Sequence, residues 1–304
     1  MTNIINALGP LFALIALGAV LGAGRFLPAS FWPQLERLVY FVLFPAMLVA
    51  TLATAEIGRV PVGRLAVVLL GSMMAFAWAL WRLRHRLGLE AAAFTSVLQG
   101  ALRFNTYVGV AGAAALHAGQ GATVAAVAVA LMVPTVNVIC VAGFVAAGTL
   151  GRAGLGKSAL ALIKNPLIIA CLLGVGLNLS GVGLPGFSEE VVTLVGRAAL
   201  PLGLLAVGVA LRLPALLRLN RGVFAAAGVK LVLMPGLALA LAWLLRLDPV
   251  SRDVALLFAA LPTATSAYIL ARQLGGDAEL MAAIITGQTL LAMLTLPLWL
   301  QLAA

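Results

Sequence analysis

The chain has 304 residues, of which 63% are hydrophobic and 9% are charged, and its mean hydropathy is +1.15. In a soluble domain, roughly a quarter of all residues are charged. This composition therefore excludes a soluble protein and predicts an integral membrane protein. The net charge of +10 does not indicate a nucleic-acid partner, because the basic residues are scattered over the predicted loops.

Ten apolar stretches are long enough to cross a bilayer as α-helices. Apolar and polar residues alternate only weakly, and Gly and Ala are frequent. Both features argue against a β-barrel, whose strands would have about ten residues. Ten spans leave no room for a soluble domain, so the function is expected to lie within the membrane. The expected spans are 5–23, 35–53, 62–81, 91–115, 122–147, 161–180, 188–211, 223–245, 252–274 and 278–302.

Lys and Arg are unevenly distributed over the loops. If the N-terminus faces outward, twelve basic residues lie on the cytoplasmic side and four on the outer side. The positive-inside rule then predicts a multi-pass protein of the inner (cytoplasmic) membrane with both termini on the non-cytoplasmic side. The cytoplasmic residues are Arg25, Arg37, Arg82, Arg84, Arg86, Arg152, Lys157, Lys164, Arg212, Arg218, Arg221 and Arg272, and the outer ones are Arg59, Arg64, Arg246 and Arg252.

The two halves of the chain repeat a pattern of helix-breaking residues. Pro10 and Pro45 are each followed 156 residues later by another proline, Pro166 and Pro201. Five spans in each copy are an odd number, so the second copy enters the membrane from the opposite side and the copies are inverted-topology repeats. The expected domains are a first five-helix repeat at 1–147, a cytoplasmic linker at 148–164 and a second five-helix repeat at 165–304.

Two expected spans are interrupted by polar or helix-breaking residues. The sequence LPTATSAY, Leu261–Tyr268, lies within the span 252–274, and RFNTY, Arg103–Tyr107, lies within the span 91–115. Thr106 and Pro262 keep the 156-residue spacing. A proline frees a backbone carbonyl, which hydroxyl or amide side chains can satisfy again. Two interrupted helices at matching places indicate the binding site of a transporter, so helices 4 and 9 are expected to cross as broken helices near the midplane.

Broken helices turn half-helix ends toward the middle of the membrane, where free N–H groups attract an anion. Polar side chains at the breaks, and in the fifth and tenth spans beside them, are therefore candidates for substrate contact. The alternative is that they only satisfy freed backbone groups or hold helices together. The candidate substrate-binding residues are Asn105, Thr106, Pro262, Thr263, Thr265, Ser266, Asn137 and Gln288.

Arg103 and Lys230 also lie within expected spans, where a charge is costly and indicates a function. None of the nine acidic residues lies deep in a span, so neither cation has an obvious carboxylate partner. Both are candidates for charge compensation or anion contact; a half-helix end, water and a substrate carboxylate remain open as partners. The lack of buried acids also disfavours a sodium site or a carboxylate proton relay, although Lys230 could couple protons.

Six motifs lie between residues 103 and 277: Arg103–Gly109, Pro134–Val138, Lys164–Ile168, Leu261–Tyr268, Ala271–Gln273 and Gly275–Asp277. Together they resemble the auxin efflux carrier family, especially its short bacterial members, and more distantly the plant PIN-formed auxin transporters. The resemblance implies an all-α membrane fold of ten helices, similar to that of bile-acid symporters. Helices 1, 2, 6 and 7 would form a scaffold, and helices 3–5 and 8–10 a transport domain that moves like an elevator.

The same resemblance implies that Asn105 contacts a substrate carboxylate and that Pro262 breaks helix 9. The plant members also have a proline at the first break, where this chain has Thr106. That departure leaves the first break in doubt and the auxin substrate unsupported.

The expected function is secondary transport of a small organic anion, a carboxylate. The alternative is a sodium- or proton-coupled organic acid symporter of the bile-acid-transporter type, and a channel or sensor also remains open. We expect no enzyme, since HExxH and G-x-S-x-G motifs are absent, and no catalytic residue, cofactor or metal. The expected partners are the substrate anion, the lipid bilayer and a second copy of the chain through the scaffold.

Overall fold

The computed structural model describes residues 2–149, 156, 160, 164–218 and 220–303. Every regular element in these residues is a helix, and none of them forms a strand. Seven helical stretches of the described chain are long and apolar enough to cross a membrane. The prediction of an all-α, multi-pass membrane protein is therefore confirmed.

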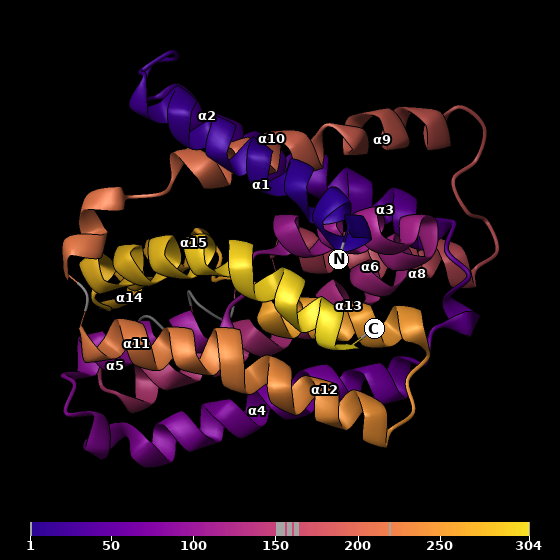
Figure 1. Cartoon of the computed structure of the whole chain (residues 1–304). Helices are drawn as coiled ribbons and strands as arrows, with labels where there is room; N and C mark the ends of the chain where they lie inside the picture. The colour runs from indigo at the N-terminus through magenta and orange to yellow at the C-terminus, as the bar shows by residue number, and fades with distance from the viewer. Residues whose placement is uncertain (1, 150–155, 157–159, 161–163, 219, 304) are drawn as a thin grey trace. The chain divides into compact units, whose positions relative to one another are not determined.

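The helices follow one another along the chain as labelled in Figure 1. They are α1 (Thr2–Ala23), α2 (Phe31–Leu38), η1 (Val39–Leu43), α3 (Phe44–Ala53), η2 (Ile57–Arg59), α4 (Val62–Leu87), α5 (Ala91–Leu102), α6 (Thr106–Ala146), α8 (Pro166–Leu179), α9 (Ser188–Arg197), α10 (Ala199–Val209), η3 (Leu213–Arg218), α11 (Arg221–Gly228), η4 (Val229–Leu233), α12 (Met234–Leu244), α13 (Pro249–Ala260), α14 (Ser266–Leu274) and α15 (Ala278–Ala303).

Three parts of the chain differ from the expected spans. The fourth and fifth spans lie in one apolar stretch, Ala91–Ala146, which is interrupted after α5 and kinked at His117 and Ala118. The ninth expected span is divided into α13 and α14, because the chain leaves the helical conformation at Leu261. The sixth is represented by α8, which has 14 residues. Most of the predicted linker 148–164 lies outside the described residues.

The chain forms two compact units, and each is described by itself. Unit 1 consists of Met1–Val62, Thr106–Val133 and Ile163–Ala210. Unit 2 consists of Gly63–Asn105, Pro134–Leu162 and Leu211–Ala304. The division falls between Asn105 and Thr106, and again within α6.

In unit 1, α1 packs against α10, and glycines allow their backbones to approach closely. A Cβ atom on Gly18 would overlap the carbonyl group of Leu205, and one on Gly208 would overlap the carbonyl oxygen of Ile15. Small residues allow this close approach of helix backbones, which drives helix association in lipid. The glycines of α1 and α10 therefore hold two helices of one chain together.

Replacing Gly208 with Ala is expected to lower the free energy of unfolding by about 1–3 kcal/mol, as overpacking does elsewhere. The added methyl group would meet the backbone atoms Ile15 O and Ala19 N, so α1 and α10 must separate. Thermal unfolding in detergent measures the effect. Gly228→Ala is the matched control, since nothing lies within 4 Å of a Cβ atom there. Equal melting temperatures of the two variants would contradict the prediction.

Also in unit 1, α8 packs against α3, and polar residues at both ends of α8 hold backbone groups. Asn165 caps its N-terminus by accepting hydrogen bonds from the N–H groups of Leu167 (2.9 Å) and Ile168 (3.4 Å). Asn178 donates from Nδ2 to the carbonyl oxygens of Ala53 (3.2 Å) and Ala55 (2.7 Å). The Asn165–Pro166 pair thus has a structural role at the start of a helix.

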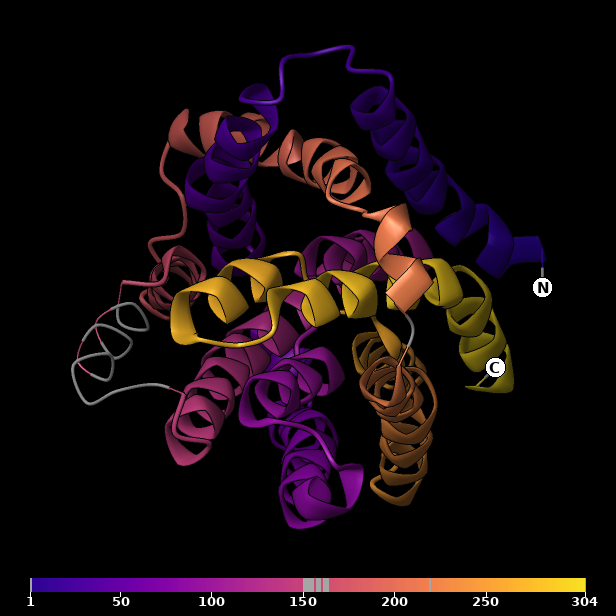
Figure 2. The same cartoon turned by 90° about the vertical axis from the view of Figure 1, so that its left-hand side faces the viewer.

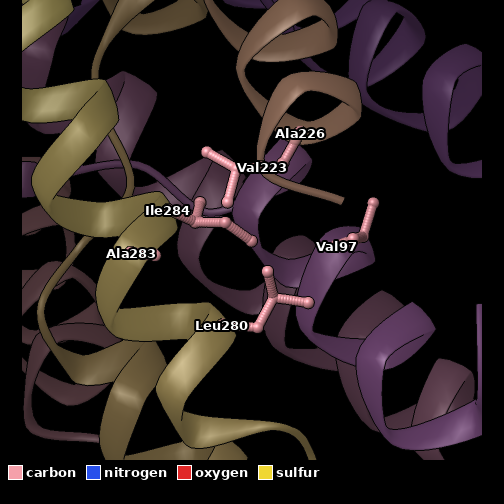
Figure 3. Packing of buried hydrophobic residues seen from close by; sticks show 6 residues of the cluster. All are labelled: Val97, Val223, Ala226, Leu280, Ala283 and Ile284. Atoms are coloured by element: carbon pink, nitrogen blue, oxygen red, sulfur yellow. The ribbon is translucent and has the colours of Figure 1, made fainter. Parts of the chain in front are cut away.

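Unit 2 is built around α5, α11 and α15, whose apolar side chains meet in one cluster (Figure 3). Gly100 on α5 belongs to this contact, because a Cβ atom there would lie 2.6 Å from Cγ2 of Ile284. Figures 1 and 2 show α14 and α15 side by side. Between these helices, Ala267 and Ala271 pack against Met281 and Ile285. The cluster comprises Val97, Val223, Ala226, Leu280, Ala283 and Ile284.

The turn Gly275–Asp277 joins α14 to α15 and ties both to the start of α5. Gly275 has a φ of +80°, which favours glycine at the end of a helix. Asp277 caps α15 by accepting from the N–H of Leu280 (2.9 Å), and its own N–H donates to the carbonyl oxygen of Ala92 (3.1 Å). Ser96 Oγ donates to the Asp277 carbonyl oxygen (2.8 Å). This motif therefore positions α5 beside α15.

A single π-helical turn interrupts the long helix that α11 and α12 form in Figure 1. The turn, Val229–Leu233, directly precedes the helix that contains Pro235. Because proline has no N–H, a carbonyl group before it lacks its helical donor. Trp299 Nε1 donates to the carbonyl oxygen of Leu231 (2.8 Å) and so satisfies one such group. Unit 1 repeats this pattern at Val39–Leu43, before Pro45.

Candidate functional site

Both interrupted helices are broken in the structure, including the one without a proline. α5 ends at Leu102 and α13 at Ala260, and each is followed by a residue with helical φ and extended ψ: Arg103 (−67°, 155°) and Leu261 (−61°, 145°). The N–H of Asn105 donates to the carbonyl oxygen of Pro262 at 2.8 Å. The two breaks therefore contact each other directly within unit 2.

A buried ring of hydrogen bonds joins these breaks to α15. The Gly100 carbonyl oxygen loses its helical donor because the chain leaves α5, and it accepts instead from Gln288 Nε2 (2.8 Å). Gln288 Oε1 accepts from the backbone N–H of Thr263 (2.9 Å). The Thr263 hydroxyl lies 2.6 Å from the Gly100 oxygen and 2.8 Å from Gln288 Oε1 and donates its one proton to either. Thr263 and Gln288 thus satisfy backbone groups at the two breaks, which is the structural alternative to a role in substrate contact.

Arg103 lies at the break after α5 and joins two other candidate residues. Its Nη1 donates to Asn137 Oδ1 (2.9 Å) and its Nη2 to Ser266 Oγ (3.2 Å). Arg103, Asn137 and Ser266, which we call the arginine cluster, are all partly exposed. A guanidinium group has five N–H donors, and these contacts use only two of them. No carboxylate among the described residues pairs with Arg103. The arginine cluster therefore presents a positive charge without a carboxylate partner, and Arg103 has N–H donors that Asn137 and Ser266 do not use.

Lys230 is fully buried on the π-helical turn, which packs against α5, α13 and α15. Its Nζ lies 3.8 Å from the Met234 sulfur and 5.9 Å from the centre of the Phe104 ring. The second contact is a cation–π interaction. No acidic residue of the described chain forms an ion pair with Lys230.

The remaining candidates occupy different positions around the breaks. Asn105 and Pro262 are buried at the contact between the two interrupted segments. Thr265 directly precedes α14 and is partly exposed. Thr106 is the first residue of α6 and belongs to unit 1, whereas Asn105, the residue before it, belongs to unit 2.

Sequence reasoning missed Gln99, Gly100 and Phe104, which surround the first break. Gly100 supplies the carbonyl oxygen of the buried ring, Phe104 contacts Lys230, and Gln99 is fully buried. The available signal was a glutamine beside a glycine within an apolar span, with two residues between the glycine and the motif Arg103–Gly109. In the described residues, no three His, Cys, Asp or Glu side chains gather as a metal site requires.

Comparison with known proteins identifies the kind of protein that carries this site. Residues 150–300 match the family described as "Membrane transport protein". The chain belongs to this family. The match confirms the resemblance to the auxin efflux carriers that the motifs indicated. The family consists of membrane transporters, so the protein acts in a lipid bilayer on a transported substrate.

Two relatives of the transporter differ in how much of it they cover. It is 25% identical over 298 residues to a protein of Methanothermobacter thermautotrophicus named "Uncharacterized transporter", and the match covers 94% of each chain. It is 33% identical over 132 residues to a Rhizobium meliloti protein named "Putative malonate transporter". That second match covers 43% of this transporter and 41% of the relative.

Proposed function

We propose that this protein is a secondary transporter that moves a small organic anion, a carboxylate, across the cytoplasmic membrane. The arginine cluster is the observation that carries the proposal. A guanidinium fork matches a carboxylate in shape and charge, and Arg103 keeps donors free for one. Its partners Asn137 and Ser266 hold it in place without neutralising it, because both are uncharged.

Malonate is the first substrate to test. One relative carries malonate in its name, although the shared segment is less than half of either chain. A small dicarboxylate also suits a region with two cations, Arg103 and Lys230, that lack a described acidic partner. Lys230 would act from a distance, since its side chain is fully buried.

The proposed architecture is a ten-helix fold of two inverted five-helix repeats with crossed broken helices. In support, α5 and α13 both have 12 residues, and Ala91 and Pro249 begin them 158 residues apart. Each follows an acidic residue, Glu90 or Asp248, in extended conformation. This register is two residues longer than the 156-residue spacing of Thr106 and Pro262.

Elevator-type alternating access, with helices 1, 2, 6 and 7 as scaffold, is part of the same proposal. The division of the chain supports part of it, since unit 1 contains α1–α3 and α8–α10, and unit 2 contains α4, α5 and α11–α15. Thr106–Val133 of α6 falls in unit 1, which differs from the proposed transport domain. Placement of both termini on the non-cytoplasmic side is supported by the distribution of Lys and Arg. A homodimer through the scaffold remains a prediction from the resemblance.

The proposal is tested by counterflow of labelled malonate and other small acids in proteoliposomes. Asn105→Ala is expected to reduce exchange about tenfold, because Asn105 lies at the contact between the breaks. Asn178→Ala is the matched control, since it removes an amide that binds backbone carbonyl groups in unit 1.

Three results would change the proposal. Unsaturable flux would favour a channel, and lack of exchange with every acid would exclude the carboxylate carrier. Exchange that requires a sodium gradient would favour the second candidate, a sodium-coupled organic acid symporter. The second candidate also includes a proton-coupled symporter, because Lys230 is a buried titratable group that could carry the proton.

A further inference from the structure

Gln99 on α5 is a fully buried amide whose two polar atoms have no hydrogen-bond partner in the described protein. Its side chain is 0% exposed, and both Oε1 and Nε2 are unpaired. The other buried polar side chains of α5 are satisfied: Thr95 donates to the Ala92 carbonyl and Ser96 to the Asp277 carbonyl. A buried polar group without a partner costs about 1–3 kcal/mol, so such a group requires an explanation.

The position of Gln99 relative to Arg103 suggests an explanation for the unpaired amide. Arg103 retains a helical φ of −67°, so its Cβ leaves α5 on the same face as Gln99, four residues earlier. Nε of Arg103 is likewise buried and unpaired, whereas its two Nη atoms are bonded to Asn137 and Ser266. One helix face therefore carries three unpaired polar atoms: two N–H donor groups and one carbonyl acceptor.

We propose that Gln99 is a further substrate-binding residue, and that its amide selects acids which carry a hydrogen-bond donor beside the carboxylate. This inference rests on the proposed role of the arginine cluster as the anion site. A carboxylate oxygen accepts from Arg103 Nε and Gln99 Nε2, and an O–H group of the same molecule donates to Gln99 Oε1. Hydroxy acids and singly protonated dicarboxylic acids share this chemistry.

Binding of matched acids to the purified, full-length transporter tests the inference. Hydroxymalonate and malonate at neutral pH differ by one hydroxyl donor, and malonate at a lower pH supplies a protonated carboxyl group instead. We expect the wild type to bind hydroxymalonate about tenfold more tightly than malonate at neutral pH, as one added hydrogen bond allows. Tighter malonate binding at lower pH, without a preference for hydroxymalonate, would identify the protonated acid as the source of the donor.

Gln99→Leu and Gln99→Met preserve the volume of the side chain and are expected to abolish this discrimination. Their melting temperatures without acid should equal or exceed that of the wild type, because no bond within the protein is lost. Thr295→Val on α15 is the matched control, since it also removes a buried, unpaired hydroxyl and should leave acid binding unchanged.

The outcomes separate the two proposals. Wild-type protein that binds none of the acids would contradict the proposed function, and this inference with it. Wild-type protein that binds them, with unchanged discrimination in both Gln99 variants, would overturn this inference alone. A lower melting temperature of both variants would also overturn it, because the amide would then serve the fold.

Discussion

Replacing Arg103 with Leu is expected to reduce carboxylate counterflow about a hundredfold. Removing one partner of a desolvated, hydrogen-bonded charge pair costs about 2–5 kcal/mol, and the partner here is the bound anion. The variant also removes the hydrogen bonds that Arg103 donates to Asn137 Oδ1 and Ser266 Oγ. Initial rates of exchange in proteoliposomes, corrected for the amount of folded protein, measure the effect.

Arg103→Lys should lie between the wild type and Arg103→Leu. An ammonium group keeps the charge but lacks the planar fork that reaches Asn137 and Ser266 together. Arg64→Leu is the matched control within unit 2, because Arg64 donates only to the carbonyl oxygens of Leu245 and Arg246. If Arg103→Leu exchanged acids at the wild-type rate, the anion would have to bind elsewhere.

Gln288→Leu is expected to lower the free energy of unfolding by about 2–4 kcal/mol. The substitution leaves the Thr263 N–H unpaired and removes one of two donors from the Gly100 oxygen, all in a fully buried setting. The unpaired buried N–H costs about 1–3 kcal/mol, and the lost hydrogen bond to the Gly100 oxygen adds about 1 kcal/mol. Denaturant or thermal unfolding in detergent shows the loss, and Gln273→Leu, at an exposed position of α14, serves as the control.

The same variant distinguishes the two interpretations of Gln288. A large loss of stability supports its role in holding the breaks together. If Gln288→Leu unfolded like Gln273→Leu but no longer transported acids, Gln288 would instead be a substrate contact. Thr263 shares the ring, so the result applies to both residues.

Two candidate amides illustrate how far residue type alone predicts a role. Asn137 and Gln288 were equivalent in the sequence, because each is an amide within an apolar span next to an expected break. In the structure, Gln288 is fully buried and bonded to backbone groups, whereas Asn137 is partly exposed and accepts from Arg103. The difference depends on which partner each side chain meets, and those partners are distant in the sequence.

The sequence by itself determined that this is an all-helical membrane transporter with an interrupted helix at Pro262. Hydropathy is a local property, and a chain in lipid must satisfy its backbone groups within each segment, so apolar stretches predict helices reliably. A proline interrupts a helix through its own missing N–H. The family motifs are likewise short stretches of residues, and comparison with known proteins confirmed the family.

Only the tertiary structure decided that the first helix breaks without a proline. Its freed groups are satisfied by residues about 160 to 190 positions away: Pro262 accepts from the Asn105 N–H, and Thr263 and Gln288 reach the Gly100 carbonyl. No local pattern reveals whether such partners are near. The arginine cluster depends on the same contact between the two breaks, because Ser266, which binds Arg103, lies 163 residues further along the chain.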